Sequence, residues 1–224
     1  MVRPILEGRK TQTRRVVKLP KSAIAKIDPP DHYVIWQQSA REGHLLPSFE
    51  VLHWSNDRVE SIPILCPYGQ AGDSLWVKET YLDFIPEHRP PRYVYRADVV
   101  DSESEKIRQE YGYKWKPSIF MPRLASRITL PILKIRVEQL QDISEDDAIA
   151  EGIERKIIDQ AVFCRDYSTQ SHWFNNWADT PGAAYIAKAS FSTLWDLING
   201  KTYPWESDPW VWIIEFPSLE KRTK

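Results

Sequence analysis

The sequence predicts an α+β fold that is mainly β, built as a small, partly closed barrel with helices over its openings. Composition is the first reason, because ten Trp and seventeen Pro among 224 residues are typical of many short strands joined by ordered loops. Two or three segments also carry helix signals. The last segment, Pro209–Phe216, is apolar on both faces, as expected for a buried central strand.

The N-terminal elements are short. Arg3–Gly8 is expected to form one helical turn that ends at Gly8, since glycine adopts the left-handed conformation that follows a helix at little cost. A strand is expected to start at Arg14. Pro20–Ile62 is then a polar, irregular insertion with two short apolar pieces, which we expect to lie outside the core.

The middle of the chain alternates strands and turns. Turn residues at 69–73 precede a strand over Leu75–Thr80, and Arg92–Asp98 forms another strand. Ser102–Gly112 is a short polar helix. From Ala125 to Leu140 the chain is rich in β-branched residues, and Pro131 indicates a bulge or a sheet edge there.

Two helices are expected near the C-terminal end. Ser144 is the N-cap of the first, Asp147 is its capping-box acid, and Gly152 ends it. The second is an amphipathic helix over residues 183–198, closed by Asn199 and Gly200.

Charge is segregated along the chain although the net charge is only -1. Met1–Lys26 carries eight basic residues and one acid, and Tyr111–Val137 carries six basic residues and no acid. The neutral total excludes a general polycation. If the two basic segments face each other, they form a local anion-binding wall.

The sequence predicts neither a metal site nor a membrane-spanning segment. Cys66 and Cys164 form no CxxC pair, and the five histidines lack metal-ligand spacing, so we predict no metal and no cofactor. No apolar run reaches the roughly 18 residues that span a bilayer, and the first residues lack the apolar core of a signal peptide. A cytoplasmic location is therefore expected.

Five motifs occur in this order along the chain: "ILEGRKTQTRR", "GQAGDSLWVKET", "RITLPILKIRVEQL", "ISEDDAIAEGI" and "WVWIIEF". Together they resemble the ASCH domain family, relatives of the PUA RNA-binding fold. The resemblance implies one PUA-like barrel domain over residues 1–224, with insertions at 20–62, 82–116 and 154–182. The family signature G-x-K-x-x-E-x-R reads Gly8, Lys10, Thr13 and Arg15 here, so threonine replaces the usual glutamate.

The N4-acetylcytidine amidohydrolase branch of that family also carries threonine at this point. Similarity to it implies that Lys10, Thr13 and Glu151 are catalytic, with Glu145 or Asp147 as alternatives for the acid. Neighbouring arginines and burial should lower the pKa of Lys10, so that its neutral amine serves as a base. Thr13 is then the nucleophile or holds water, and Glu151 passes a proton to the leaving amine.

Further residues are candidates for substrate or RNA binding. They are Arg9, Arg14, Arg15, Trp76, Trp115, Arg123, Ser126 and Arg127. The arginines suit phosphate contacts and the two tryptophans suit base stacking. The alternative for Arg15 is a surface ion pair with an acid such as Glu151, and the alternative for Arg123–Arg127 is a solvated strand edge.

The leading hypothesis is a protein that binds RNA or a modified nucleoside and hydrolyses N4-acylated cytidine. A ribonuclease acting on single-stranded RNA is a second reading. A non-catalytic RNA-binding module is a third, in which the cluster at Gly8–Arg15 only holds phosphates. A phage or prophage accessory protein, whose insertions bind a protein partner, is the fourth.

Overall fold

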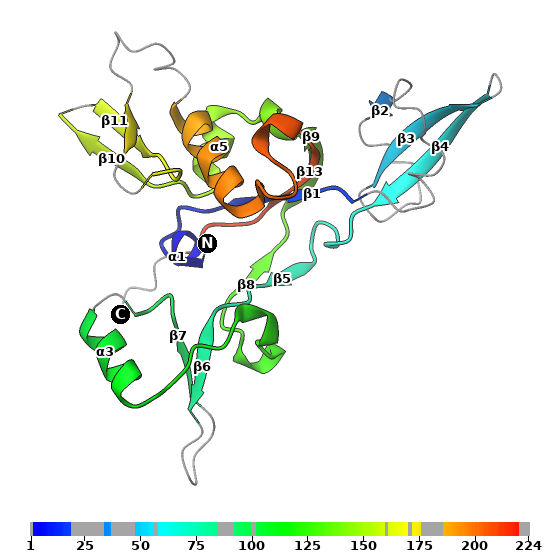
Figure 1. Cartoon of the computed structure of the whole chain (residues 1–224). Helices are drawn as coiled ribbons and strands as arrows, with labels where there is room; N and C mark the ends of the chain where they lie inside the picture. Colours follow the sequence, from blue (N-terminus) through cyan, green and yellow to red (C-terminus); the bar gives the residue numbers. More distant parts are fainter. Residues whose placement is uncertain are drawn as a thin grey trace.

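The computed structural model describes residues 2–18, 34–36, 48–55, 58–84, 92–99, 102–159, 161–169, 172–175 and 186–219. Helices and strands are mixed, and the strands form several small antiparallel sheets (Figure 1). This mixture agrees with the predicted α+β class. Among the described residues the strands do not join into a closed barrel.

The central sheet has three strands, in the order β1 (Gln12–Val16), β13 (Trp210–Glu215), β9 (Lys134–Gln139). As the sequence predicted, β13 is buried in the middle. Val211 and Ile213 pack into one hydrophobic cluster, whereas Trp212 and Ile214 pack into another on the opposite face. Because successive strand residues point to opposite faces, a strand buried on both sides must be apolar throughout.

Helices cover one face of this sheet. The cluster that contains Val211 and Ile213 is closed by α5 (Ile186–Asn199), which buries Phe191 and Trp195 there. Next to it lies α4 (Glu145–Ala150), preceded by Ser144, whose hydroxyl accepts a hydrogen bond from the Asp147 amide. This N-cap was predicted.

The expected capping box is not completed. In place of a return bond to the Ser144 amide, the Asp147 carboxylate accepts hydrogen bonds from Arg136 and Arg14. The competing partners are cations, which bind a carboxylate more strongly than a neutral amide does.

On the other face, β13 packs against a two-stranded sheet of β5 (Ser74–Trp76) and β8 (Thr129–Pro131). Leu75, Ile132 and Ile135 share a cluster with Trp212 and Ile214. Pro131 ends β8 at a sheet edge, as expected. The predicted strand over Leu75–Thr80 is shorter than expected, because only the first residues pair with β8.

The first helical turn, α1 (Val2–Leu6), ends before Gly8, whose φ of 72° is the left-handed value expected there. Its buried Ile5 packs with Leu130 and Phe216. This places the chain from Gly8 to Lys10 at the entry to β1, beside the C-terminal end of α4, because the Thr11 amide donates to the Ala150 carbonyl.

Three peripheral sheets lie outside this centre (Figure 1). They are β2 (Val34–Trp36), β3 (Ser48–Ser55) and β4 (Arg58–Leu65); β6 (Tyr81–Phe84) and β7 (Arg92–Tyr95), which precede α3 (Ser102–Glu110); and β10 (Arg155–Ile158), β11 (Ala161–Arg165) and β12 (Trp173–Asn175). They fall close to the three predicted insertions. The first insertion was expected to be irregular, but its apolar pieces pair with each other as strands.

Short 3-10 helices connect several elements: η2 (Ser118–Phe120), η3 (Arg123–Ala125), η4 (Leu140–Asp142) and η6 (Trp205–Ser207). Within the described ranges, no helix combines the length and the apolar character that crossing a membrane requires.

Candidate functional site

Lys10 is a buried cation whose ammonium faces the end of α4. Its side chain is 3% exposed, and Nζ donates to the Glu151 carbonyl at 2.8 Å and to Glu151 Oε2 at 2.6 Å. Burial lowers the pKa of Lys10 below its usual 10.5, although the nearby Glu151 carboxylate opposes this shift. Arg15 and Arg14 lower it further. The predicted direction of this pKa shift therefore agrees with the structure, and desolvation is its main cause.

Glu151 is the acid that the structure brings to Lys10. It follows the last turn of α4, and its second oxygen, Oε1, accepts a hydrogen bond from Arg14 Nη1 at 3.2 Å. Of the three acids considered from the sequence, Glu145 binds the first amides of α5, and Asp147 binds Arg136 and Arg14. Glu151 alone among these three contacts Lys10.

Gly152 makes the close approach of Lys10 to α4 feasible. Its φ is 85°, and an added Cβ would lie 2.8 Å from the Cβ atoms of both Lys10 and Pro4. A side chain at this position would therefore push Lys10 away from Glu151 as well as strain the backbone. The sequence predicted Gly152 only as a helix stop.

Arg14 belongs to a charge network and not to an open binding surface. Its side chain is 1% exposed and lies within 4.0 Å of Glu151, Asp147 and Glu138. Its Nε lies buried without a partner among the described residues. The guanidinium therefore faces α4 and the core beneath α5, where Phe191 lies 5.8 Å below it.

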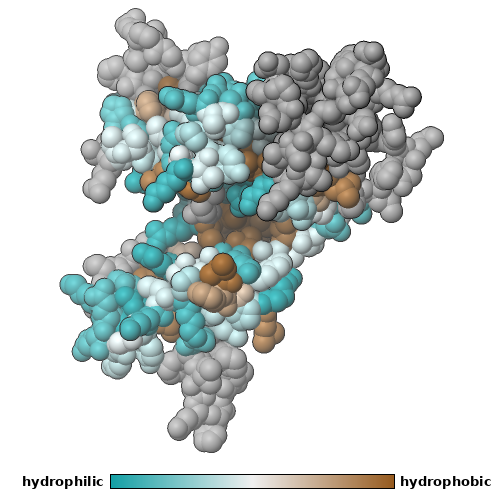
Figure 2. All heavy atoms as spheres, turned by 45° about the vertical axis from the view of Figure 1, so that its right-hand side comes forward, coloured by the Kyte–Doolittle hydropathy of each residue, from teal (hydrophilic) through white to brown (hydrophobic). Residues whose placement is uncertain are grey.

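Thr13 and Arg15 lie on the opposite side of β1 from Arg14, because strand residues alternate between faces. Together with Lys10 they line a cavity of about 330 Å³. The cavity is also lined by Val2, Ile5, Tyr68, Leu75, Trp76, Val77, Lys78, Leu130, Ile214 and Phe216. Figure 2 shows hydrophobic side chains gathered in a hollow between the two halves of the molecule.

The Thr13 hydroxyl has no hydrogen-bond partner within the part of the chain that the structure describes, and it is not hydrogen-bonded to Lys10 Nζ. Thr13 is 7% exposed, and it also lines a small void of about 20 Å³ together with Glu151. The two predicted catalytic side chains therefore meet at one cavity, but a direct lysine–threonine contact is not preformed.

Trp76 forms part of the cavity wall and carries two cations on its ring. Lys78 Nζ lies 4.9 Å and Arg123 Cζ lies 5.5 Å from the ring centroid. Cation–π contacts at exposed sites contribute about 0.5–1 kcal/mol each, whereas stacking of a base on an aromatic ring contributes about 1–3 kcal/mol. A base could therefore replace one of these cations on the indole.

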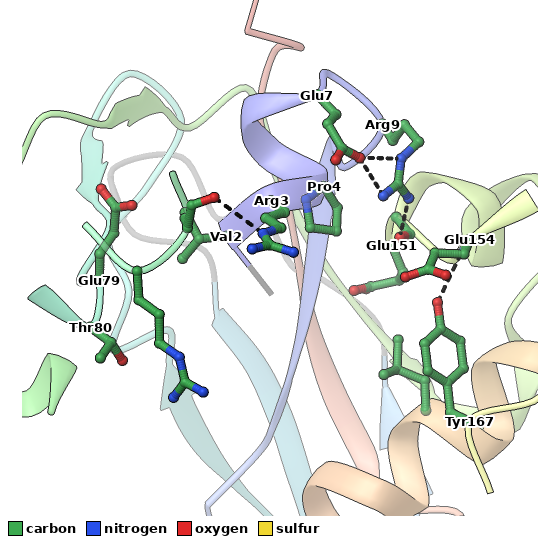
Figure 3. Close-up of a pocket in the computed structure, with 14 residues that line it drawn as sticks. Val2, Arg3, Pro4, Glu7, Arg9, Glu79, Thr80, Glu151, Glu154 and Tyr167 are labelled. Atoms are coloured by element: carbon green, nitrogen blue, oxygen red, sulfur yellow. Dashed lines mark hydrogen bonds and ion pairs between the residues drawn. The ribbon is translucent and has the colours of Figure 1, made fainter. Parts of the chain in front are cut away.

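A larger cavity, of about 620 Å³, is lined by Val2, Arg3 and Pro4 of α1 and by residues of other segments (Figure 3). Its charged groups are mostly paired already. Arg9 binds Glu7 and the carbonyls of Gly152 and Ile153, and Arg3 binds the carbonyls of Ala97 and Val99. Because these donors are occupied, the smaller cavity beside Lys10 is the better candidate site.

Glu151 lines the larger cavity, whereas Lys10 lines the smaller one. Their contact therefore lies in the wall between the two. Arg9, predicted to bind substrate, belongs to the larger cavity and does not line the Lys10 cavity.

The remaining predicted binding residues lie outside the Lys10 cavity. Trp115 donates to Glu105 and is covered by Arg108, so it belongs to the α3 region. Ser126 donates to backbone carbonyls. Arg127 forms two-pronged contacts with Glu79 and with Asp98. Arg123 does not line the cavity, but its guanidinium lies over the ring of Trp76, which does.

Tyr68 and Lys78 also line the cavity, but the sequence reasoning did not single them out. Lys78 follows Trp76 by two residues, so strand alternation could have placed it on the same face. Tyr68 carried no local signal, because it arrives through the packing of the chain after β4 against β13. Burial raises the pKa of Tyr68, although the positive charge of Arg15 opposes this.

Among the described residues, no group of three or more His, Cys, Asp or Glu side chains is placed so that it could hold a metal ion. A scan against protein-family models, a search of curated proteins and a search of solved structures each found no match. The family resemblance therefore rests on the sequence motifs alone.

Proposed function

We propose that this protein hydrolyses the amide of an N4-acylated cytidine in the cavity beside Lys10. The observation that carries the proposal is the meeting of Lys10, Thr13 and Arg15 on one wall of that cavity, with Glu151 bound to the lysine from behind. For Lys10, Thr13 and Glu151 the family resemblance implied catalysis, and Arg15 was predicted to bind substrate. A volume of about 330 Å³ lies in the range of small-molecule sites, roughly 300–1,000 Å³.

Lys10 is suited to act as the general base. Its lowered pKa increases the fraction of neutral amine near neutral pH. Because no hydrogen bond joins Nζ to the Thr13 hydroxyl, we place a water between them as the attacking group, held by Thr13. The water oxygen bonds to the acyl carbon, the bond from that carbon to N4 breaks, and the water proton passes through Lys10 to N4. The products are cytidine and the carboxylic acid.

Glu151 acts through Lys10 in this scheme. Its carboxylate lies 2.6 Å from Nζ, so it stabilises the ammonium that forms when Lys10 takes the proton. Arg14 holds the other carboxylate oxygen and thereby fixes its orientation. Glu151 and Arg14 are therefore positioning residues.

The fold assignment to a PUA-like barrel of the ASCH family is part of the same proposal. Its support is that β1, β13 and β9 pack against β5 and β8 around a shared apolar core, and that the cavity opens beside that core. A cytoplasmic protein with RNA or nucleoside ligands follows from the same assignment.

The decisive test compares Thr13→Val with Thr11→Val. Valine keeps the shape of threonine and removes only the hydroxyl, and Thr11 does not line the cavity. With N4-acetylcytidine as substrate, we expect Thr13→Val to lower kcat by about a hundredfold or more and Thr11→Val to change it less than threefold. Equal rates for both variants would contradict a role for the Thr13 hydroxyl.

Lys10→Met provides the second arm, because methionine has similar length and cannot take a proton. We expect turnover to fall by at least about a hundredfold while thermal unfolding still shows a folded protein. Absence of acylcytidine hydrolysis by the wild-type protein would overturn the proposal.

A non-catalytic binder is the second candidate, and the close contact between Lys10 and Glu151 favours it. Such a buried pair also occurs as a purely structural feature. In that case, Thr13→Val should leave the affinity for cytidine derivatives unchanged within twofold by calorimetry, and no acid should be released.

A further inference from the structure

Three basic side chains lie at or next to the Lys10 cavity and form what we call the basic rim: two of them line the cavity, and the third packs on the ring of Trp76, which also lines it. We define it as Arg15, Lys78 and Arg123, all exposed. Each contacts neutral oxygen atoms: Arg15 binds the Arg14 carbonyl, Lys78 the Ile119 carbonyl and Arg123 the Thr129 hydroxyl. Within the described residues, none of the three has a carboxylate within 4.0 Å.

Six other basic side chains of the described residues differ from this rim. Lys10, Arg14, Lys116, Arg127, Arg136 and Arg165 each contact at least one carboxylate. Three neighbouring cations without acidic partners leave a local positive charge on a chain whose net charge is -1. Such a rim favours an anionic ligand.

Beside the rim lies a loop, residues 117–125, that presents apolar side chains to solvent. Ile119 and Phe120 are each 70% exposed, and Leu124 is 84% exposed. The Lys78 ammonium connects this loop to the cavity mouth through the Ile119 carbonyl.

The loop is anchored by buried residues and by hydrogen bonds to its carbonyls, so its backbone is held in place. Met121 and Ala125 are buried in a cluster with Tyr81 and Tyr95. The Tyr81 hydroxyl donates to the Phe120 carbonyl at 3.1 Å, and the Tyr95 hydroxyl donates to the Ala125 carbonyl at 2.6 Å. A ligand that packs on an exposed ring of such a loop must immobilise the side chain but need not order the backbone, which reduces the entropic cost of binding.

We propose that the basic rim and Phe120 bind single-stranded RNA, so that the acylated cytidine enters the cavity as one residue of an RNA strand. In this arrangement, Trp76 and Phe120 stack bases, while Arg15, Lys78 and Arg123 contact phosphates. Cations next to one exposed ring, Phe120, and one half-buried ring, Trp76, suit a polynucleotide, whereas a free nucleoside would use only the cavity. The inference names the substrate class of the proposed function and rests on it.

The first experiment measures binding alone, so its outcome does not depend on catalysis. The probe is a fluorescently labelled, unmodified pyrimidine oligoribonucleotide, followed by anisotropy at several salt concentrations. Phe120→Ala should weaken binding about tenfold, whereas Tyr111→Ala, which removes an equally exposed aromatic ring outside the loop, should bind like wild type. Arg123→Gln should reduce the slope of log affinity against log salt by about 0.7, the value for one phosphate of a single strand.

The second experiment compares kcat/KM for N4-acetylcytidine as a free nucleoside and inside an oligoribonucleotide. We expect the oligonucleotide to be favoured at least about tenfold, and Phe120→Ala to remove most of that advantage. Equal use of both substrates would overturn the inference and leave the hydrolase proposal intact. Oligonucleotide binding without hydrolysis of either substrate would contradict the hydrolase proposal.

Two further outcomes would also overturn the inference. One is an absence of RNA binding by the wild-type protein at low salt. The other is RNA affinity in Phe120→Ala equal to that of wild type, which would leave the exposed loop as a surface for a protein partner.

Discussion

At the residue scale, the proposed chemistry depends on the environment that sets the pKa of Lys10. Lys10 is desolvated by its surroundings and at the same time bonded to a carboxylate, and these two effects act on its pKa in opposite directions. Desolvation is the larger, so the amine gives up its proton more readily than a free lysine does. A base of this kind must work best on the alkaline side of neutrality.

The pH dependence of hydrolysis follows from this. We expect kcat/KM to rise with pH and to level off above a pKa lower than 10.5, because only the neutral amine takes a proton. Rates measured from about pH 5 to about pH 10 will show this limb. A profile that falls with rising pH across that range would rule out Lys10 as the base.

Gly152 allows a second test at this scale. Comparison with Gly112 separates the cost of the backbone conformation of Gly152 from the cost of its close contacts. Gly112 also follows a helix with positive φ, but an added Cβ there meets no atom within 4 Å. Gly112→Ala should therefore cost only the backbone term, about 1 kcal/mol. Gly152→Ala should cost at least about 2 kcal/mol and lower turnover at least tenfold, because the new methyl group displaces Lys10.

Urea unfolding and turnover of both variants will decide this. If the two alanine variants lose equal stability and Gly152→Ala keeps full activity, the contact between Gly152 and Lys10 has no functional weight.

At the element scale, a charge network joins β1, β9, β13 and α4. Arg136 on β9 contacts Glu138, Asp147 and Glu215, and Asp147 in turn contacts Arg14 on β1. Burial tends to raise the pKa of Asp147, but the positive charges of Arg136 and Arg14 outweigh this and hold it below its usual value. Stability from this group is present above that usual value and is lost as the pH falls through the lowered pKa.

Removing Arg14 should therefore destabilise the protein much more than removing its neighbour. Arg14→Met should lower the free energy of unfolding by about 2–3 kcal/mol, because Glu151 and Asp147 each lose a cationic partner. The cost is not larger because Lys10 still pairs with Glu151 and Arg136 still pairs with Asp147. Arg15→Met, at an exposed residue of the same strand, should change it by less than about 0.5 kcal/mol. Urea titrations with unchanged slopes will measure both values, and equal costs would show that the network is energetically neutral.

Local signals predicted the elements better than the contacts between them. Gly8, Ser144 and Gly152 marked helix boundaries correctly, because caps and left-handed glycines act within one turn. The sequence could not show that Arg14 faces α4 while Arg15 faces the cavity. That difference depends on which side of β1 the helices cover, which is a property of tertiary packing.

At the scale of the whole molecule, the candidate site draws on segments far apart in the chain. Lys10 and Thr13 come from the N-terminal segment, Trp76 from β5, Glu151 from α4 and Phe216 from the chain after β13. The resemblance to a known family predicted Lys10, Thr13 and Glu151 together. Lys78 and Tyr68 were not predicted to line the cavity, because their positions there depend on how β5 and the chain after β4 pack against β13.

The same organisation predicts how stability is distributed over the molecule. Strand β13 is paired on both sides, and its residues Val211–Ile214 are almost fully buried, so its amides should exchange with solvent only when the whole protein unfolds. Among the described strands, β10 pairs only with β11, and all four residues of β10 are exposed. Hydrogen–deuterium exchange followed by mass spectrometry should therefore show the slowest exchange in the β13 peptide and exchange at least about a hundredfold faster in β10. Arg14→Met should speed exchange in β13 by the factor that corresponds to its loss of unfolding free energy, while β10 should change little because it opens locally. If β13 exchanged as fast as β10, or if Arg14→Met left β13 unaffected, then β13 would not be the structural centre that its pairing and burial indicate.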